Sequence, residues 1–162
     1  MQLLFMRFDD VEASAFWQTI KRRKKRIAVR YKMSTLAHNR SSNILLNAAL
    51  LAGQKGMMAD SEKMFAKAIL LKEKSAGRGT EYATMLVSFA DMYMDHENAA
   101  KAEPLYAEAL GILSSSHGDD HLSIALLMRS LSEACHRLGR YNESHKWCLQ
   151  AKEILKQHRR CS

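Results

Sequence analysis

Three segments of this chain repeat one another at spacings of 41 and 42 residues, and this periodicity limits the fold to a stack of similar units. The segments begin at Ser61, Ala102 and Ser144 and read SEKMFAKAILL, AEPLYAEALGIL and SHKWCLQAKEIL. Several independent positions keep this register, so chance explains it poorly. They comprise a bulky packing position (Phe65, Tyr106 and Cys148), two positions of small residues (Ala68, Ala109 and Ala151; Ala49, Ala90 and Ser132) and a turn position (Gly56, Glu97 and Gly139).

Each unit is predicted to form two helices joined by a tight turn. Apolar residues recur at helical spacing within the units, and the chain has one proline among 162 residues, which favours an all-α fold. The expected first helices are Ser41–Lys55, Glu81–His96 and His121–Leu138, and the expected second helices are Ala59–Lys74, Ala99–Leu113 and Tyr141–His158.

The single proline, Pro104, falls inside the second helix of the second unit. A proline there removes one backbone hydrogen bond, because its ring nitrogen carries no hydrogen. In the register of the repeat, Pro104 points away from Ala102, Tyr106 and Ala109, and therefore towards solvent. We expect the helix to continue through it with a slight bend.

The stretch ADMYMDHENAAKAEPLYAEALGIL and the linker GDDHLSIA at 118–125 resemble the tetratricopeptide repeat, in the 42-residue form found in kinesin light chains. Leu122 replaces the proline of that linker, and Cys148 replaces an aromatic residue. The resemblance covers residues 41–158 and implies a right-handed superhelical solenoid of about three helix-turn-helix repeats, followed by a tail at 159–162.

In such a solenoid the first helices line a concave surface, where segments of partner proteins commonly bind. Matching the register gives a groove that is apolar at one end, acidic in the middle and basic at the other end. A terminal-carboxylate clamp is not expected, because only Arg129 and Arg137 offer the required charge. The predicted groove residues are Asn43, Leu46, Leu50, Thr84, Val87, Asp91, Met94, Asp95, Arg129, Glu133, His136 and Arg137.

Residues 1–40 form a basic arm, which we expect to be helical from about residue 10 to residue 37. The arm contains ten of the 25 basic residues and only three acidic ones, so it carries most of the net charge of +8. Phe16, Ile20, Ile27 and Tyr31 fall on one helical stripe. The candidate polyanion-binding residues are Lys21, Arg22, Arg23, Lys24, Lys25, Arg26 and Arg30.

Several interpretations of the arm stay open. Residues 20–32 could contact nucleic acid through phosphates, lie on an anionic membrane surface, serve as a calmodulin-like target helix or act as a nuclear-import signal. The plain structural alternative is a solvated helix whose apolar stripe caps the first repeat.

No catalytic or metal site is predicted, and no cofactor. Cys135, His136, His145 and Cys148 could suggest zinc, but both cysteines fall at packing positions of the repeat and no CxxC pair supports a site. An odd count of three cysteines favours an intracellular, reducing compartment. The cytoplasm is preferred, with the nucleus and mitochondrion as alternatives, and no transmembrane segment or secretion signal is expected.

The sequence therefore predicts a non-enzymatic scaffold or adaptor, a small subunit of a larger assembly that binds protein partners in its groove. The alternative is a subunit of a ribonucleoprotein, anchored by the arm. An exposed edge at Trp147 and Leu155, on the second helix of the third unit, is expected to be covered by another chain.

Overall fold

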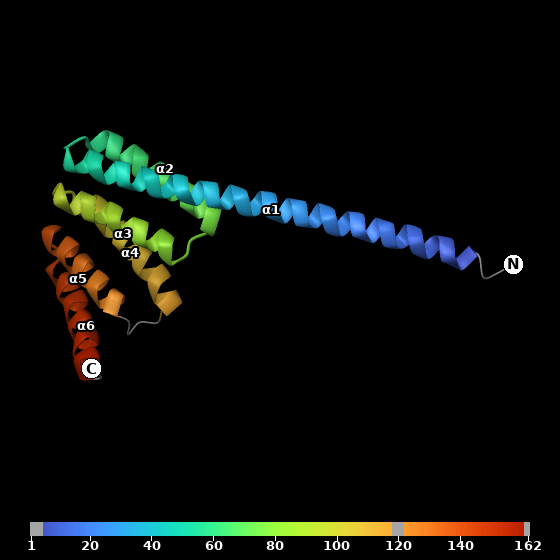
Figure 1. The fold of residues 1–162 in the computed structure, drawn as a ribbon. Helices are drawn as coiled ribbons and strands as arrows, with labels where there is room; N and C mark the ends of the chain where they lie inside the picture. The colour runs from blue at the N-terminus through green and yellow to red at the C-terminus, as the bar shows by residue number, and fades with distance from the viewer. Residues whose placement is uncertain (1–4, 118–121, 161–162) are drawn as a thin grey trace. The chain divides into compact units, whose positions relative to one another are not determined.

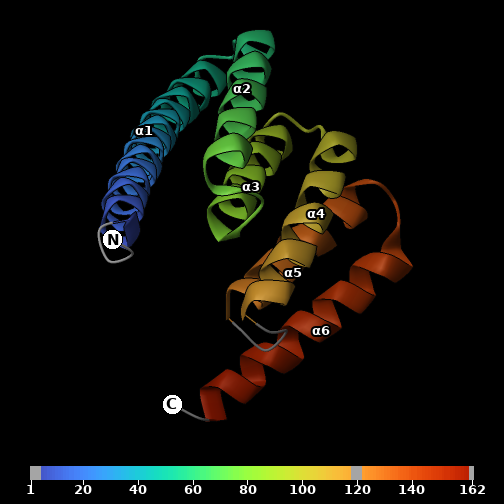
Figure 2. The ribbon, with the colours of Figure 1, turned by 90° about the vertical axis from the view of Figure 1, so that its right-hand side faces the viewer.

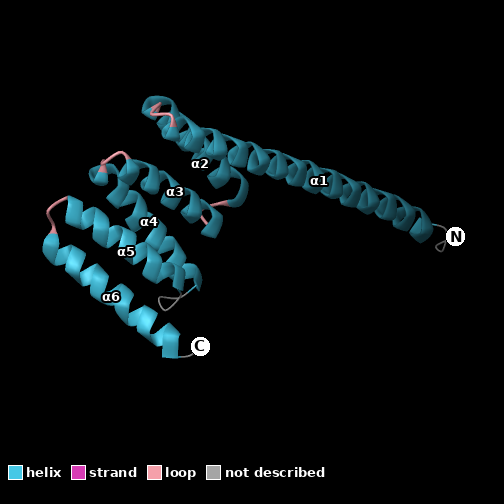
Figure 3. Cartoon of the chain, turned by 60° about the vertical axis from the view of Figure 1, so that its left-hand side comes forward, coloured by secondary structure: helices cyan, strands magenta, loops and turns pink. Residues whose placement is uncertain are grey.

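The computed structural model describes residues 5–117 and 122–160, and these residues form helices joined by short turns (Figure 3). No strand occurs in that part of the chain. The all-α prediction is confirmed. The helices are α1 (Phe5–Gln54), α2 (Met58–Ala76), α3 (Thr80–Asp95), α4 (Ala99–His117), α5 (Leu122–Arg137) and α6 (Tyr141–Arg160).

The first helix differs from the prediction. No helix begins at Ser41, because α1 runs without a break from Phe5 to Gln54 and contains residues 5–40 of the basic arm as well as the first helix of the first repeat. This stretch has no proline or glycine before Gly53, so nothing in it stops a helix. By packing, the chain divides into residues 1–37 and residues 38–162.

The expected start of the third repeat, His121, lies outside the described residues, as does most of the linker before Leu122. At the C-terminus, α6 continues to Arg160, two residues into the expected tail. The remaining two residues of that tail are outside the described part.

Within residues 38–162 the helices form three pairs that follow one another in chain order (Figures 1 and 2). The first pair is the C-terminal part of α1 with α2, the second is α3 with α4, and the third is α5 with α6. This arrangement is the helical repeat that the sequence predicts.

The three turns inside the pairs share one backbone conformation. Gly56, Glu97 and Gly139 have φ angles of 75°, 59° and 75°. In each turn the next amide donates to the carbonyl five residues back, at 2.8 to 2.9 Å, which satisfies carbonyls at the end of the first helix. The backbone conformation therefore agrees with the equivalence of these three positions that was inferred from their spacing.

Small residues let the two helices of each pair approach closely. Ala68, Ala109 and Ala151 are fully buried. Serines take the same role where they replace alanine, because the Ser61 hydroxyl donates to the Ala49 carbonyl at 2.7 Å and thereby satisfies its own polar atom.

Larger side chains fill the space between neighbouring pairs. The ring of Phe65 on α2 stacks on Phe89 of α3 with centroids 4.6 Å apart, and Phe89 contacts Tyr93 at 4.7 Å. Pro104 is exposed, and α4 continues through it as the register predicts.

Candidate functional site

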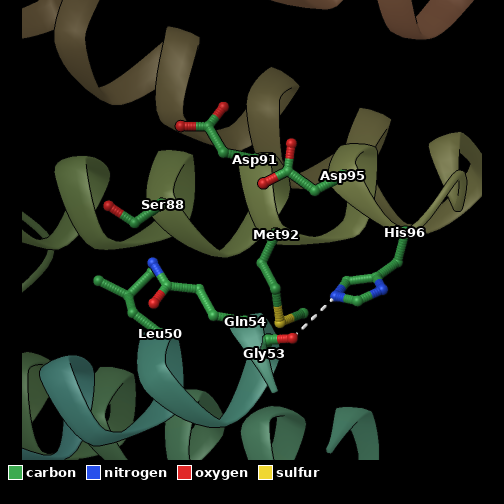
Figure 4. Close-up of a pocket in the computed structure, with 8 residues that line it drawn as sticks. All are labelled: Leu50, Gly53, Gln54, Ser88, Asp91, Met92, Asp95 and His96. Carbon is green, nitrogen blue, oxygen red and sulfur yellow. Dashed lines mark hydrogen bonds between the residues drawn. The ribbon is translucent and has the colours of Figure 1, made fainter. Parts of the chain in front are cut away.

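A hollow of about 330 Å³ lies between the C-terminal end of α1 and α3 (Figure 4). These are the first helices of the first two repeats, so the hollow falls on the surface that the register predicts to be concave. Its lining residues are Leu50, Gly53 and Gln54 from α1, Ser88, Asp91, Met92 and Asp95 from α3, and His96 just after α3.

The floor of the hollow depends on a glycine. A Cβ atom added to Gly53 would lie 3.1 Å from Cγ of Met92, so only a residue without a side chain allows this approach without a shift. The imidazole Nε2 of His96 lies 3.2 Å from the Gly53 carbonyl oxygen, and this contact holds the ends of α1 and α3 together (Figure 4).

Two exposed carboxylates form the acidic wall of the hollow. Asp91 and Asp95 are four residues apart on α3, and Figure 4 shows them on the same side of that helix. The Tyr106 hydroxyl donates a hydrogen bond to Oδ1 of Asp91 at 2.5 Å. Burial raises the pKa of Tyr106, and the bond to Asp91 raises it further, so this phenol stays protonated and fixes the carboxylate.

The structure brings three predicted groove residues, Leu50, Asp91 and Asp95, to this hollow. Four other predicted residues on these helices, Asn43, Leu46, Thr84 and Val87, precede the lining residues of their own helix in the sequence and do not line the hollow. Asn43 and Thr84 are exposed, whereas Leu46 and Val87 are half-buried and pack against the core.

Met94 does not line a groove. Its side chain is only 8% exposed and belongs to the core, because α3 is in the middle pair and is packed from both sides. The sequence register placed it on the surface, and this placement is corrected.

The predicted groove residues of α5, namely Arg129, Glu133, His136 and Arg137, are exposed but do not line the hollow. Arg137 donates to Glu133 at 2.6 Å and to the Met94 carbonyl at 2.8 Å, which ties α5 to the end of α3. The His136 ring packs edge-on against Tyr141 at 5.2 Å.

Sequence reasoning missed five of the lining residues, namely Gly53, Gln54, Ser88, Met92 and His96. Gln54 and Ser88 could have been found, because they continue the four-residue spacing of Leu50 and Thr84 along each helix. His96 gave no such signal, since it follows the helix and its contact with Gly53 depends on tertiary packing.

In residues 1–37, the predicted polyanion-binding side chains of Lys21–Arg26 and Arg30 are all exposed. Arg23, Arg26, Ile27 and Arg30 line a shallow hollow of about 450 Å³. Ile27 and Tyr31 of the predicted apolar stripe are each 68% exposed, whereas the side chain of Phe16 is outside the described part.

The third repeat places its cysteines as packing residues. Cys135 is buried, and burial raises the pKa of its thiol, so it is a poor nucleophile. Cys148 is half-buried, and both thiols are free. Among the described residues no group of three or more His, Cys, Asp or Glu side chains could hold a metal ion.

The expected exposed edge at Trp147 and Leu155 is corrected, because both side chains are half-buried and pack against the core. Of the helices that the structure describes, none has the length and apolar character needed to span a membrane.

Comparison with known proteins agrees with this geometry. A family model described as "Tetratricopeptide repeat" matches residues 81–157. Over 80 residues the chain is 31% identical to "Protein KINESIN LIGHT CHAIN-RELATED 1" of Arabidopsis thaliana. The aligned region covers 49% of this chain and 13% of that protein. The chain thus spans only a small part of this relative.

A solved structure has the same fold. The crystal structure of BtubC (BKLC) from P. vanneervenii superposes with a TM-score of 0.67 at 16% identity, covering 73% of this chain and 48% of that one. Together the comparisons confirm the resemblance that the repeated residues predict.

Proposed function

We propose that this chain, which carries tetratricopeptide repeats similar to those of kinesin light chains, is a scaffold that binds a segment of a partner protein in the groove between α1 and α3. Tetratricopeptide repeats generally mediate protein–protein interactions, and the fold is typically non-enzymatic. We further propose that the chain works inside the cell, in the cytoplasm, as a subunit of a larger assembly. Two free thiols support a reducing compartment.

The size and the lining of the hollow support this proposal. Its volume suits one long side chain, and its walls combine apolar surface at Leu50 and Met92 with the carboxylates of Asp91 and Asp95. A lysine or arginine of a partner fits this combination, because its stem can lie along apolar surface while its cationic end meets the carboxylates. We therefore expect partner segments with a basic anchor residue.

Peptide binding to the full chain tests this proposal. Fluorescence anisotropy would compare an extended peptide containing a central arginine with the same peptide containing glutamine. We expect the Asp91→Asn/Asp95→Asn variant to bind the arginine peptide about tenfold or more weakly, since charged hydrogen bonds are lost.

Asp60→Asn is the matched control, because Asp60 is a partly exposed aspartate on α2, away from the hollow. This variant should bind like the unmodified chain. Equal binding of the arginine and glutamine peptides, or equal loss in both variants, would contradict the proposal.

A second function, association with nucleic acid, is favoured by one observation: the seven predicted polyanion-binding side chains of the arm are all exposed. Replacing Lys21–Arg26 with glutamine should abolish binding to a generic duplex or single strand. Binding by the unmodified chain should also weaken steeply as salt rises, since phosphate contacts release counterions. Binding that is insensitive to salt would exclude this function.

A further inference from the structure

One side of α1, within the first helix pair, presents apolar residues to solvent. Ile44 and Leu51 are 61% and 57% exposed. They are seven residues apart, so they lie on the same side of the helix two turns from each other, with Ala48 between them. Isolated exposed apolar residues are common, but these recur at the spacing of a packing face.

The repeat register shows what this face does elsewhere in the molecule. Ile44 is equivalent to Met85 of α3 and Leu127 of α5, at spacings of 41 and 42 residues, and both of these are nearly buried, at 3% and 5% exposure. The Ser42 hydroxyl in the first pair lies 3.6 Å from the sulfur of Met85. The face of α3 therefore packs on the preceding pair.

The residues equivalent to Leu51 in the later repeats are buried as well. Its equivalents are Met92 and Ala134, which are 5% and 0% exposed. Met92 contacts the first pair through Gly53, and its sulfur lies 2.9 Å from the hydroxyl oxygen of Ser61. In the second and third repeats this face is an inter-repeat interface, whereas in the first repeat it is uncovered.

Basic side chains border the uncovered face. Lys55 directly follows α1, and Lys67 and Lys74 are exposed on α2. The register equates Lys67 and Lys74 with Gln150 and Gln157 of α6, which line the hollow between α4 and α6 and so face the preceding pair. The two lysines therefore lie on the same side of the first pair as Ile44 and Leu51.

We propose that this N-terminal face, defined by Ile44, Ala48 and Leu51 with Lys55, Lys67 and Lys74 around them, binds an amphipathic helix of a partner protein. The helix fits if it carries an apolar ridge flanked by aspartate and glutamate. A helix is the occupant because helices fill the equivalent faces of α3 and α5. Acidic flanks complement the lysines, whereas a second copy of the same face would set lysine against lysine.

The outward side of the third pair has the opposite character. Arg129 takes the place of Leu46 and Val87, and Lys152 takes the place of Ile69 and Leu110. In the third pair, charged residues thus stand where the earlier repeats have apolar residues that are buried in the core or packed against it. The N-terminal face is the side of this array that is built to accept another helix.

A synthetic probe tests the proposal on the full chain. The probe is a labelled alanine-rich helical peptide with leucines at positions i, i+4 and i+7 flanked by glutamates, and the comparison peptide has lysines in place of the glutamates. We expect the glutamate peptide to bind in anisotropy measurements and the lysine peptide to bind at least about tenfold more weakly.

Exposed residues allow clean variants. Ile44→Ser/Leu51→Ser should weaken binding of the glutamate peptide by about tenfold or more, because the buried apolar area is lost. Leu126→Ser/Leu149→Ser is the matched control, since these leucines are 49% and 52% exposed on the third pair. Circular dichroism should show that both variants remain helical.

Several outcomes would overturn the proposal: no binding at millimolar peptide, equal binding of both peptides, or equal effects of the two double variants. Concentration-dependent dimers that disappear in Ile44→Ser/Leu51→Ser would assign the face to a second copy instead. Loss of binding in Asp91→Asn/Asp95→Asn alone would place the peptide in the groove, which would refute this inference and leave the proposed function standing.

Discussion

At the scale of single residues, Glu97 stands out because it adopts a left-handed conformation that glycine holds in the other two repeats. Its φ is 59°, while Gly56 and Gly139 have φ of 75°. A residue with a Cβ atom is strained in this region, and the strain is accepted here because the turn otherwise makes the same hydrogen bonds as its counterparts.

Glu97→Gly should therefore stabilise the protein by about 1 kcal/mol. Urea unfolding followed by circular dichroism would measure the change in free energy of unfolding. Gly139→Ala, made at the equivalent turn, should destabilise by a similar amount. If Glu97→Gly lowers stability, a side-chain contact of Glu97 outweighs the backbone strain.

Tyr93 makes the free energy of unfolding depend on pH in the alkaline range. Burial, reinforced by a hydrogen bond with Glu62, raises the pKa of Tyr93 from 10.0 to about 12. Because the folded state holds the proton more tightly, the contribution of Tyr93 to stability is complete below pH 10 and is lost as the pH rises towards 12.

Tyr93→Phe cannot titrate, so between pH 10 and 12 this variant should lose about 2 kcal/mol less stability than the unmodified chain. Urea midpoints measured at several pH values would show the difference. Tyr31→Phe is the control, since Tyr31 is exposed. Parallel pH profiles for the unmodified chain and Tyr93→Phe would exclude the linkage.

Residue-level prediction succeeded where the repeat fixed a position and failed where partners come from other elements. The turn positions and the small buried alanines followed from spacing alone. Lys72 did not, because lysines are rarely buried. It is 3% exposed, and its ammonium donates to Asn39 and to Glu81, the latter at 2.8 Å. Those acceptors lie on α1 and α3, so no local pattern in α2 could reveal them.

At the scale of elements, α4 shows that a helix can keep an internal proline when the proline faces solvent. Pro104 is exposed, and the neighbouring Ala102 and Tyr106 are buried. The packing of the buried side holds the helix together across the missing hydrogen bond.

Replacing Pro104 with alanine should restore a hydrogen bond to the Ala100 carbonyl and raise stability by about 1 to 3 kcal/mol. Thermal and urea unfolding would both report the gain. Lys63→Ala is the matched control, because Lys63 holds the equivalent exposed position in α2 and already has an amide hydrogen. No gain in Pro104→Ala would mean that the array requires the bend.

The helix α1 shows where prediction from sequence failed, because the helix start expected at Ser41 falls inside it. The expected helix start at Ser41 lies in a run of serine and asparagine residues, which are types that can cap helices. In the structure the Ser42 hydroxyl instead donates to the Ala68 carbonyl at 2.9 Å and packs inside the first pair. A serine used for close packing and a serine used for capping look alike in a single sequence.

At the scale of the whole molecule, the register predicted the order of the pairs and the helices that bear the groove. It could not predict how deeply each side chain is covered. Met94 is buried because the middle pair has neighbours on both sides, whereas Leu50 and Asp91 line the hollow. Coverage depends on position within the array, and repeated sequence positions do not encode it.

The uncovered N-terminal face has a dynamic consequence. In a linear array each pair is stabilised by its neighbours, so the first pair, which among the described residues has a neighbouring pair on one side only, should open more often than the second. Amide hydrogens of α2 should therefore exchange with deuterium faster than those of α3 and α4, as mass spectrometry of the exchanging chain would show. A helix bound to Ile44 and Leu51 should slow the exchange of α2 selectively. Binding at the N-terminal face could therefore be measured as protection of the α2 amides from exchange.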